Sequence, residues 1–526
     1  MADEHLTRRS FVAGAGGLVV ASAFPLTSVA ARARRNPLAR GGRFLSGVAC
    51  GEPARHGAIV WTRLHEVESA AQVRLEVAAD PGFRRVLHRE LVPVLPDRDF
   101  TVKTRINRIA LQPGERYWYR FATQTTSSPV GRLQTRRPPD SREPARIGFF
   151  SCQRWEHGYF TPQAALARED LDLVVSLGDY LYEEDSGAKL PARRQSTGAP
   201  NGHVETLAQW RAKHRLYRTD PRLQAMHAAH PVMAIWDDCE VEGNWAGPGP
   251  SSGPSPVDAR SVPFAVKRAN GIRTFFENFP VQAGGGERFR IYRNLRIGRN
   301  AELFLLDTRQ YRDPQPCRDG TLTDPAYAAC FEDRQPGRTF LGAAQKRWLL
   351  DRLPSSQATW KVLGNAQMMM ALDLPTGKPV QSDPWDGYDA ERHEVLEGLR
   401  GRGVRNLTSI VGDVHTFFAG DLTTTGRVGG QPIGTEFVGS SVTHDGLGVD
   451  PLSQEDFDRL ADNLPLANPH LRYSRFGVRG YGVLEARPDE LNVTFRAAET
   501  VLEPTSDVYD LARFRVRAGT PAVERV

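Results

Sequence analysis

The chain has 526 residues, more than one hydrophobic core usually spans, so two domains are the first expectation. Hydrophobic residues make up 40% and charged residues 25% of it, which excludes a wholly disordered chain. Lys and Arg number 68 against 62 Asp and Glu, and a net charge of +6 without a long basic tract does not indicate specific nucleic-acid binding.

Residues 1–33 have the pattern of an export signal. The pair Arg8-Arg9 precedes an apolar stretch at 11–24, and small residues then offer cleavage after Ala30 or Ala33. Because a run of 14 residues is too short to cross a bilayer, we expect a cleaved signal and no stable membrane anchor. The paired arginines favour the twin-arginine export machinery over an ordinary Sec signal, and therefore a periplasmic or secreted protein.

The segment 44–140 predicts a small all-β domain. Short strands separated by Pro and Gly at this spacing are typical of β-sandwiches. The pattern Leu-x-Pro-x-x-x-Tyr-x-Tyr, from Leu111 to Tyr119, resembles fibronectin type III domains. We therefore expect a fibronectin-III-like N-terminal domain that ends before a linker at 138–140. Its predicted strands are 58–62, 73–77, 100–109 and the alternating run 111–121.

The segment 145–515 predicts an α/β domain that carries the chemistry. Apolar runs without alternation belong to sheets covered on both faces, and amphipathic stretches at 162–169 and 343–353 predict covering helices. Polar groups just beyond the carboxyl ends of strands are where open α/β sheets bind ligands. The four predicted strands that end on such groups are 147–150, 173–177, 232–235 and 407–411.

Five side chains at these strand ends make up the central candidate site. Each has an ordinary explanation when taken alone, such as a turn aspartate or a buried thiol. A thiol, two carboxylates, a phenol and an imidazole at the ends of neighbouring strands are harder to explain by chance. Asp413 and His415 also point the same way if their strand continues, because side chains alternate along a strand. The five residues are Cys152, Asp179, Tyr182, Asp413 and His415.

The donor types of this set indicate a metal centre. A phenolate needs a strongly charged ion to lower its pKa, so thiolate and phenolate together favour Fe(III) over Zn(II). Oxygen ligands nearby suit a harder second ion such as Ca(II) or Mg(II). Ions that share Asp179 would activate water or oxide and neutralise charge in a displacement at phosphorus. The sequence therefore predicts a metal-dependent hydrolase of phosphate esters.

The chain also resembles the PhoD family of alkaline phosphatases and phosphodiesterases over nearly its whole length. The resemblance implies an N-terminal β-sandwich before a metallophosphatase-like αββα sandwich. It implies one Fe(III) with two Ca(II) and hydrolysis of phosphate monoesters and diesters. It also puts the five candidate residues at the metal-binding motifs of the family. The matching stretches are 47–49, 61–63, 151–153, 178–182, 306–312, 363–365, 385–388, 412–415 and 436–441.

One motif departs from the family pattern. The family typically shows Trp-Asp-Asp-His-Glu followed by a pair of Asn, whereas this chain has Cys239 for the His and Gly243 for the first Asn. An imidazole there can bind phosphate or protonate a leaving group, and its loss can lower the rate by about two or more orders of magnitude. Nearby ions can instead lower the pKa of the Cys239 thiol and make it a ligand. A subfamily that never needed this imidazole is equally compatible with the sequence.

Three further residues belong to the predicted site. Asp238 and Asn244, with Asp179, are expected to complete a second-ion site. Arg309 can aim its guanidinium at phosphate, although an ion pair with Asp307 or Asp313 explains it equally well. The predicted catalytic residues are Asp179, Asn244, His415, Cys239 and Arg309. The predicted metal ligands are Cys152, Asp179, Tyr182, Asp238, Asn244, Asp413 and His415.

Two alternatives to the main prediction remain. One is a phospholipase-D-like specialist for diesters. The other is a catalytically weakened exported protein that retains its metals, which Cys239 and Gly243 favour. The cysteine count of five adds a structural expectation, because Cys317 and Cys330 flank a loop rich in Pro, Asp and Gly and predict a disulfide.

Overall fold

The computed structural model describes residues 36–107, 109, 111–184, 193, 203–250, 261–282, 289–316, 337–373, 379–446 and 454–526. The expected export signal at 1–33 and the expected disulfide between Cys317 and Cys330 lie outside these residues. Cys50, Cys152 and Cys239 are free thiols. No helix in the described part of the chain has the length and apolar character needed to cross a membrane.

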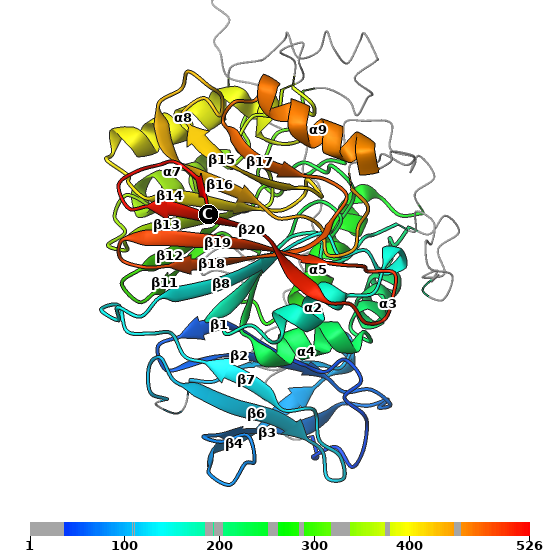
Figure 1. The fold of residues 1–526 in the computed structure, drawn as a ribbon. Helices are drawn as coiled ribbons and strands as arrows, with labels where there is room; N and C mark the ends of the chain where they lie inside the picture. The colour runs from blue at the N-terminus through cyan, green and yellow to red at the C-terminus, as the bar shows by residue number, and fades with distance from the viewer. Residues whose placement is uncertain are drawn as a thin grey trace, which may run out of the picture.

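The N-terminal strands form two small antiparallel sheets, which lie below the rest of the molecule in Figure 1. Strand β6 shows why they pack, since Tyr117, Tyr119 and Phe121 are buried while the residues between them are partly exposed. The predicted strand at 100–109 is shorter than expected. One sheet contains β1 (Val48–Ala54), β2 (Gly57–Arg63) and β5 (Thr101–Arg105), and the other β4 (Val86–Val94), β3 (Ala71–Ala78), β6 (Arg116–Ala122) and β7 (Gly131–Gln134).

The rest of the chain is built on two seven-stranded sheets that pack against each other. In spatial order the first contains β10 (Val232–Ile235), β9 (Leu173–Leu177), β8 (Ala145–Phe150), β18 (Arg479–Ala486), β19 (Glu490–Ala498), β20 (Val508–Arg517) and β21 (Glu524–Arg525). The second contains β11 (Arg293–Ile297), β12 (Ala301–Leu305), β13 (Trp360–Asn365), β14 (Leu407–Val411), β16 (Pro432–Val438), β15 (Phe417–Thr423) and β17 (Leu471–Arg475).

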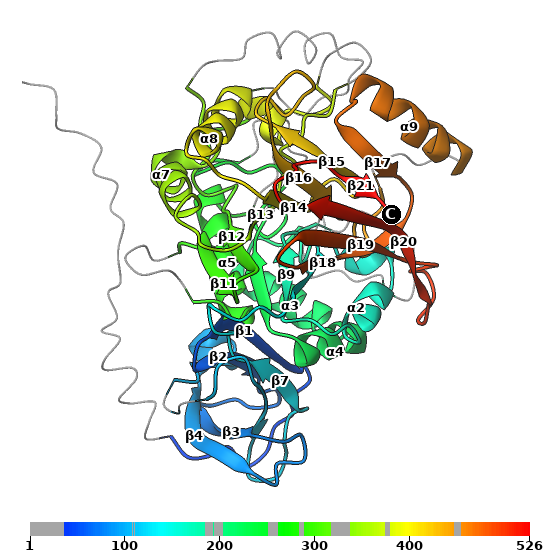
Figure 2. The same cartoon turned by 60° about the vertical axis from the view of Figure 1, so that its left-hand side comes forward.

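Helices cover the outer faces of the two sheets (Figure 2). On the side of β8 to β10 lie η2 (Trp155–His157), α2 (Thr161–Leu166), α3 (Leu207–Tyr217), α4 (Pro221–Ala229) and α5 (Phe264–Asn278). On the side of β12 to β14 lie α7 (Gly342–Arg352), η4 (Trp385–Tyr388) and α8 (Asp389–Gly401), and α9 (Gln454–Ala467) packs on β17.

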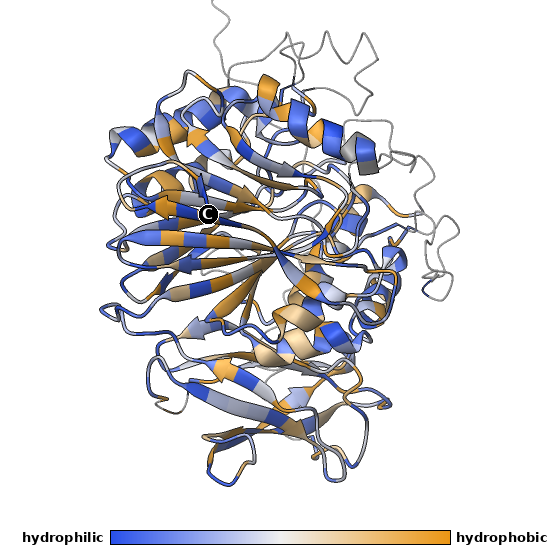
Figure 3. Ribbon diagram, in the orientation of Figure 1, coloured by the Kyte–Doolittle hydropathy of each residue, from blue (hydrophilic) through white to orange (hydrophobic). Residues whose placement is uncertain are grey.

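Strand β12 explains the continuous apolar runs in the sequence. Leu303 and Leu305 belong to the core between the sheets, whereas Phe304 and Leu306 belong to the core under α7 and α8. Successive side chains point to opposite faces of a strand, so a strand with both faces covered has consecutive apolar residues where it is buried. The hydrophobic bands along the central strands are visible in Figure 3. The predicted αββα fold class with a smaller all-β N-terminal domain is confirmed.

One expectation about strand order is wrong. Strands β8, β9 and β10 are parallel neighbours in the first sheet, but β14, which precedes Asp413 and His415, lies in the second sheet between β13 and β16. Local apolar patterns do not encode which sheet a strand joins. The strand ends still meet, because Ser151 forms a parallel bridge with Ser441 and the Val442 N–H donates to the Ser151 carbonyl at 3.0 Å.

Candidate metal centre

Two glycines allow the loops with the candidate ligands to approach closely. A Cβ on Gly178, which has a φ of +102°, would lie 2.5 Å from the Cβ of Asp237. A Cβ on Gly412 would lie 2.7 Å from the Cβ of Ser151. Only glycine avoids both collisions. The pair Gly178-Asp179 therefore lies against the loop after β10. The pair Gly412-Asp413 lies against the loop after β8.

The backbone is strained where the predicted ligands lie. Of the eleven non-glycine residues with positive φ in the described residues, five are predicted site residues, a concentration that composition alone does not explain. Such conformations cost about 1–3 kcal/mol each and persist where the surrounding structure enforces them, often at active sites. The five are Cys152, Asp179, Asn244, Asp413 and His415, with φ between 51° and 63°.

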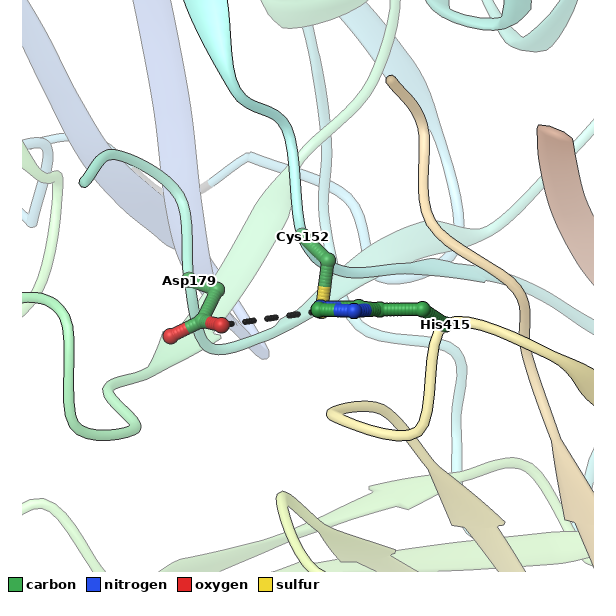
Figure 4. Close-up of side chains that lie close together, drawn as sticks. All are labelled: Cys152, Asp179 and His415. Carbon is green, nitrogen blue, oxygen red and sulfur yellow. Dashed lines mark hydrogen bonds between the residues drawn. The ribbon is translucent and has the colours of Figure 1, made fainter. Parts of the chain in front are cut away.

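The first donor group joins both sheets. Figure 4 shows Cys152, Asp179 and His415 converging from three loops, and their ligand atoms lie within 4.8 Å of one another. The Cys152 thiol donates to Asp179 Oδ2 at 3.7 Å. Tyr182 Oη donates to the same oxygen at 3.0 Å and lies 3.3 Å from His415 Nε2. The structure thus brings thiol, carboxylate, phenol and imidazole to one point, as the sequence analysis expected.

A second donor group also contains Asp179. The ligand atoms of Asp179, Asp238 and Cys239 lie within 4.8 Å of one another. The Cys239 N–H donates to Asp179 Oδ1 at 3.4 Å, and the Asn244 N–H donates to Asp238 Oδ2 at 2.7 Å. Gly243 also donates its N–H, to Glu183 Oε1 at 2.8 Å. The turn with Cys239 and Gly243, the two departures from the family motif, is therefore hydrogen-bonded to the site through its backbone.

The third donor group contains a residue that the sequence analysis missed. Asp179, Asp237 and Asp413 bring carboxylate oxygens within 4.8 Å of one another. Asp237 directly precedes Asp238 in the same strand-end motif, and that adjacency was the signal available in the sequence. In each of the three groups two residues are buried and one is half-buried, namely His415, Cys239 or Asp413. Every group is therefore open to solvent on one side.

The electrostatics of these groups fit bound cations. Burial raises the pKa of the Asp179 carboxyl well above its usual range, and the neighbouring Asp238 and Asp237 raise it further. Burial and like charges raise the pKa of Asp413 in the same way. Burial, then the Asp179 charge, raises the pKa of the Cys152 thiol. A multivalent cation would reverse these shifts, so the donor chemistry fits metal ions.

Arg309 is buried within the site but its partners differ from those expected. Its Nε donates to Asp237 Oδ1 at 2.6 Å, and its two terminal nitrogens donate to Asp383 at 3.0 and 2.8 Å. Asp238 lies 3.6 Å from it. The alternative of an ion pair with Asp307 or Asp313 is wrong in its partners, which are Asp237 and Asp383, and Asp307 instead accepts from the Arg309 backbone N–H at 3.2 Å.

A further acid fixes the geometry of the two loops. Glu240 accepts hydrogen bonds from the backbone N–H groups of Asp179 at 3.2 Å, Tyr180 at 2.8 Å and Asp237 at 2.9 Å. Burial raises the pKa of its carboxyl to about 8. Because these bonds tie the loop after β9 to the loop after β10, Glu240 positions Asp179 relative to Asp237.

Two more side chains that the sequence analysis missed stack on the first donor group. His444 lies against His415 and Tyr182, with ring centroids 4.0 and 4.8 Å apart. The guanidinium carbon of Arg154 lies 4.6 Å from the centre of the Tyr182 ring. Arg154 directly follows the strand-end motif 151–153 and was overlooked there, whereas His444 is brought in by the hydrogen bonds of its loop to the Cys152 carbonyl.

Comparisons with known proteins agree along the whole chain. A family model described as PhoD-like phosphatase matches residues 147–495, and one described as PhoD-like phosphatase, N-terminal domain, matches residues 29–137. Alkaline phosphatase D of Bacillus subtilis (strain 168) is 33% identical over an alignment of 541 positions, which covers 99% of this chain and 89% of the relative.

Solved structures give the same picture. A structure described as PhoD has a TM-score of 0.81 and 31% identity, with 92% of each chain covered. A purple acid phosphatase from yellow lupin (Lupinus luteus) seeds has a TM-score of 0.51 at 10% identity, covering 89% of this chain and 74% of the other. The second likeness concerns the metallophosphatase-like fold alone.

Proposed function

We propose that this chain, which belongs to the PhoD-like phosphatase family and is a phosphoric-ester hydrolase, is an exported, metal-dependent alkaline phosphatase and phosphodiesterase. The observation that carries the proposal is the convergence of three donor groups on one carboxylate, that of Asp179. A carboxylate shared among cations would hold them where they can stabilise the attacking and leaving oxygens of an in-line displacement at phosphorus.

The donor sets support particular ions. Cys152, Asp179, Tyr182 and His415 would hold Fe(III), because thiolate and phenolate match a strongly charged ion. The oxygen donors of Asp179, Asp237 and Asp413 suit Ca(II) or another hard divalent ion. When bound, these ions would activate the attacking water and neutralise charge that develops on the phosphate.

The residues of the chain have separate roles in this proposal. Asp179 holds the donor groups together, and Asp238 with the Asn244 side chain completes the divalent side. Asn244 fixes Asp238 through its backbone N–H. Arg309 acts on the site through Asp237 and Asp238, whose carboxylates it orients, so we assign it a positioning role.

Two narrower functions follow from particular features. A phospholipase-D-like diester specialist would show turnover of diesters far above that of monoesters. A weakened, metal-retaining protein is favoured by Cys239 and Gly243 alone. Replacing Cys239→His should raise turnover of a monoester by about a hundredfold or more if the missing imidazole limits the rate. Unchanged or lower turnover would rule out the weakened enzyme.

Export is proposed from the N-terminal pattern. Arg8-Arg9 before a short apolar run supports the twin-arginine route and a periplasmic or secreted location. Replacing both arginines by lysine in the producing bacterium should leave the protein in the cytoplasm with its N-terminus uncut. Continued processing in a strain that lacks the twin-arginine translocase would exclude this route.

The central test uses the full chain purified with its metals. We expect iron and a divalent ion in the metal analysis, and hydrolysis of a phosphate monoester and a diester at alkaline pH. Asp179→Asn should lose both ions and both activities, because the carboxylate belongs to every donor group. A wild-type preparation that hydrolyses neither substrate after reloading with metals would overturn the proposed function.

A further inference from the structure

The three donor groups differ in the chemistry of their ligands. One combines Cys152 and His415 with Asp179, and one is made of carboxylates alone. The group on the divalent side, Asp179, Asp238 and Cys239, contains a thiol. This inference rests on the proposed function and concerns the kind of ion that the last group selects.

We infer that the group of Asp179, Asp238 and Cys239 binds a thiophilic divalent cation of the Zn(II) class rather than Ca(II). Ca(II) takes roughly six to eight oxygen ligands and has no affinity for sulfur. Zn(II) is bound by carboxylate oxygen and cysteine sulfur, and its catalytic sites keep one coordination position open. The mixed oxygen and sulfur set within 4.8 Å therefore fits Zn(II) and not Ca(II).

The position of Cys239 supports a ligand role. Its backbone N–H bonds Asp179 Oδ1 at 3.4 Å, so the residue is held beside the shared carboxylate. Its side chain is half-buried, whereas the two carboxylates are buried. The thiol is thus on the open side of the group, next to the space where an open coordination position would meet substrate.

Negative charges predominate around the thiol, where the guanidinium of Arg154 also lies. Asp179, Asp238 and Glu183 all place negative charge near Cys239. Glu183 is 3% exposed, and its Oε2 has no hydrogen-bond partner among the described residues. The nearby guanidinium of Arg309 is bonded to Asp237 and Asp383 and reaches Asp238 only at 3.6 Å. A buried group of anions with an unpartnered carboxylate oxygen is stabilised by a bound cation.

The test is a competition for the intact protein. The full chain is stripped with chelator, reloaded with iron, and dialysed against equal concentrations of Zn(II) and Ca(II), and its metals are counted by mass spectrometry. Co(II) replaces Zn(II) in a parallel sample, because Co(II) bound by thiolate absorbs in the near ultraviolet. Cys239→Ser removes the sulfur, and Cys50→Ala is the matched control, since Cys50 is a free thiol buried in the N-terminal domain.

We expect wild type and Cys50→Ala to retain Zn(II) and to show the thiolate band with Co(II). Cys239→Ser should lose the band and weaken Zn(II) binding by at least about tenfold, while its iron content stays at the wild-type level. Retention of Ca(II) without Zn(II) in wild type, or an unchanged band in Cys239→Ser, overturns the inference. If wild type then still hydrolyses phosphate esters, the proposed function stands; if it hydrolyses none in any metal, that function fails separately.

Discussion

The imidazole rings of His415 and His444 stack, with centroids 4.0 Å apart and planes 27° apart. Both nitrogens of His444 are engaged, because Nδ1 donates to the Asp445 carbonyl at 2.6 Å and Nε2 accepts from Arg154 at 3.3 Å. These bonds fix the ring of His444, and its stacking contacts then restrain His415 and Tyr182. A residue outside every ligand group thereby orients two proposed ligands.

We predict that His444→Ala lowers kcat about ten- to hundredfold, the usual effect of removing a group that orients a metal ligand. His444→Phe retains a stacking ring but not the bond to Arg154, so its kcat should be intermediate. Iron content and visible absorption, measured on the same samples, separate positioning from loss of fold. Equal kcat in all three proteins would show that the stacking does not orient the ligands.

The phenol of Tyr182 gives a prediction that does not depend on activity. If Tyr182 Oη binds Fe(III), the purified protein is coloured by transfer of charge from phenolate to iron. Tyr182→Phe should shift or bleach this visible band while the chain remains folded, because the ring still stacks on His444. A colourless wild-type protein without iron would remove the thiolate and phenolate centre from the proposal.

The ion pairs of Arg309 predict a large effect on stability. Arg309→Ala leaves the buried Asp237 without its cation and leaves Asp383 paired with Arg312 alone, which should lower the free energy of unfolding by about 3–5 kcal/mol. Arg43→Ala is a suitable control, because both side chains of its pair with Glu66 are exposed by more than half and such pairs contribute about 0–1 kcal/mol. Denaturant unfolding of the metal-free proteins measures both, and equal losses would contradict the structural role of Arg309.

Particular residues show which parts of the fold and the site could be predicted from the sequence. Four site residues could be predicted from the sequence because each closely follows an apolar strand, and the strands determine where those side chains emerge. They are Asp179, Tyr182, Asp413 and His415. The position of β14 in the second sheet could not be predicted from the sequence, since either sheet accepts a strand that is apolar on both faces. The role of His444 could not be predicted either, because its hydrogen bond to Arg154 joins residues 290 positions apart and follows no local sequence pattern.

His230 connects the two domains and makes stability depend on pH. Its Nδ1 accepts from Arg132 on β7 at 3.0 Å, and its Nε2 donates to the Leu166 carbonyl at the end of α2 at 3.0 Å. Burial, then the charge of Arg132, lowers the pKa of the imidazole from 6.5 to about 4. The folded state therefore binds this proton less readily than the unfolded state does.

Because that pKa is depressed in the folded state, the His230 contribution is fully present above pH 6.5 and is lost as pH falls toward about 4. The loss attributable to this residue is at most about 3 kcal/mol, from the size of the shift. Gln can make both hydrogen bonds without titrating, so His230→Gln should unfold with a shallower dependence on pH across this window. Denaturant unfolding of both proteins between pH 4 and pH 7 measures the difference, and parallel curves would show that His230 keeps its ordinary pKa on folding.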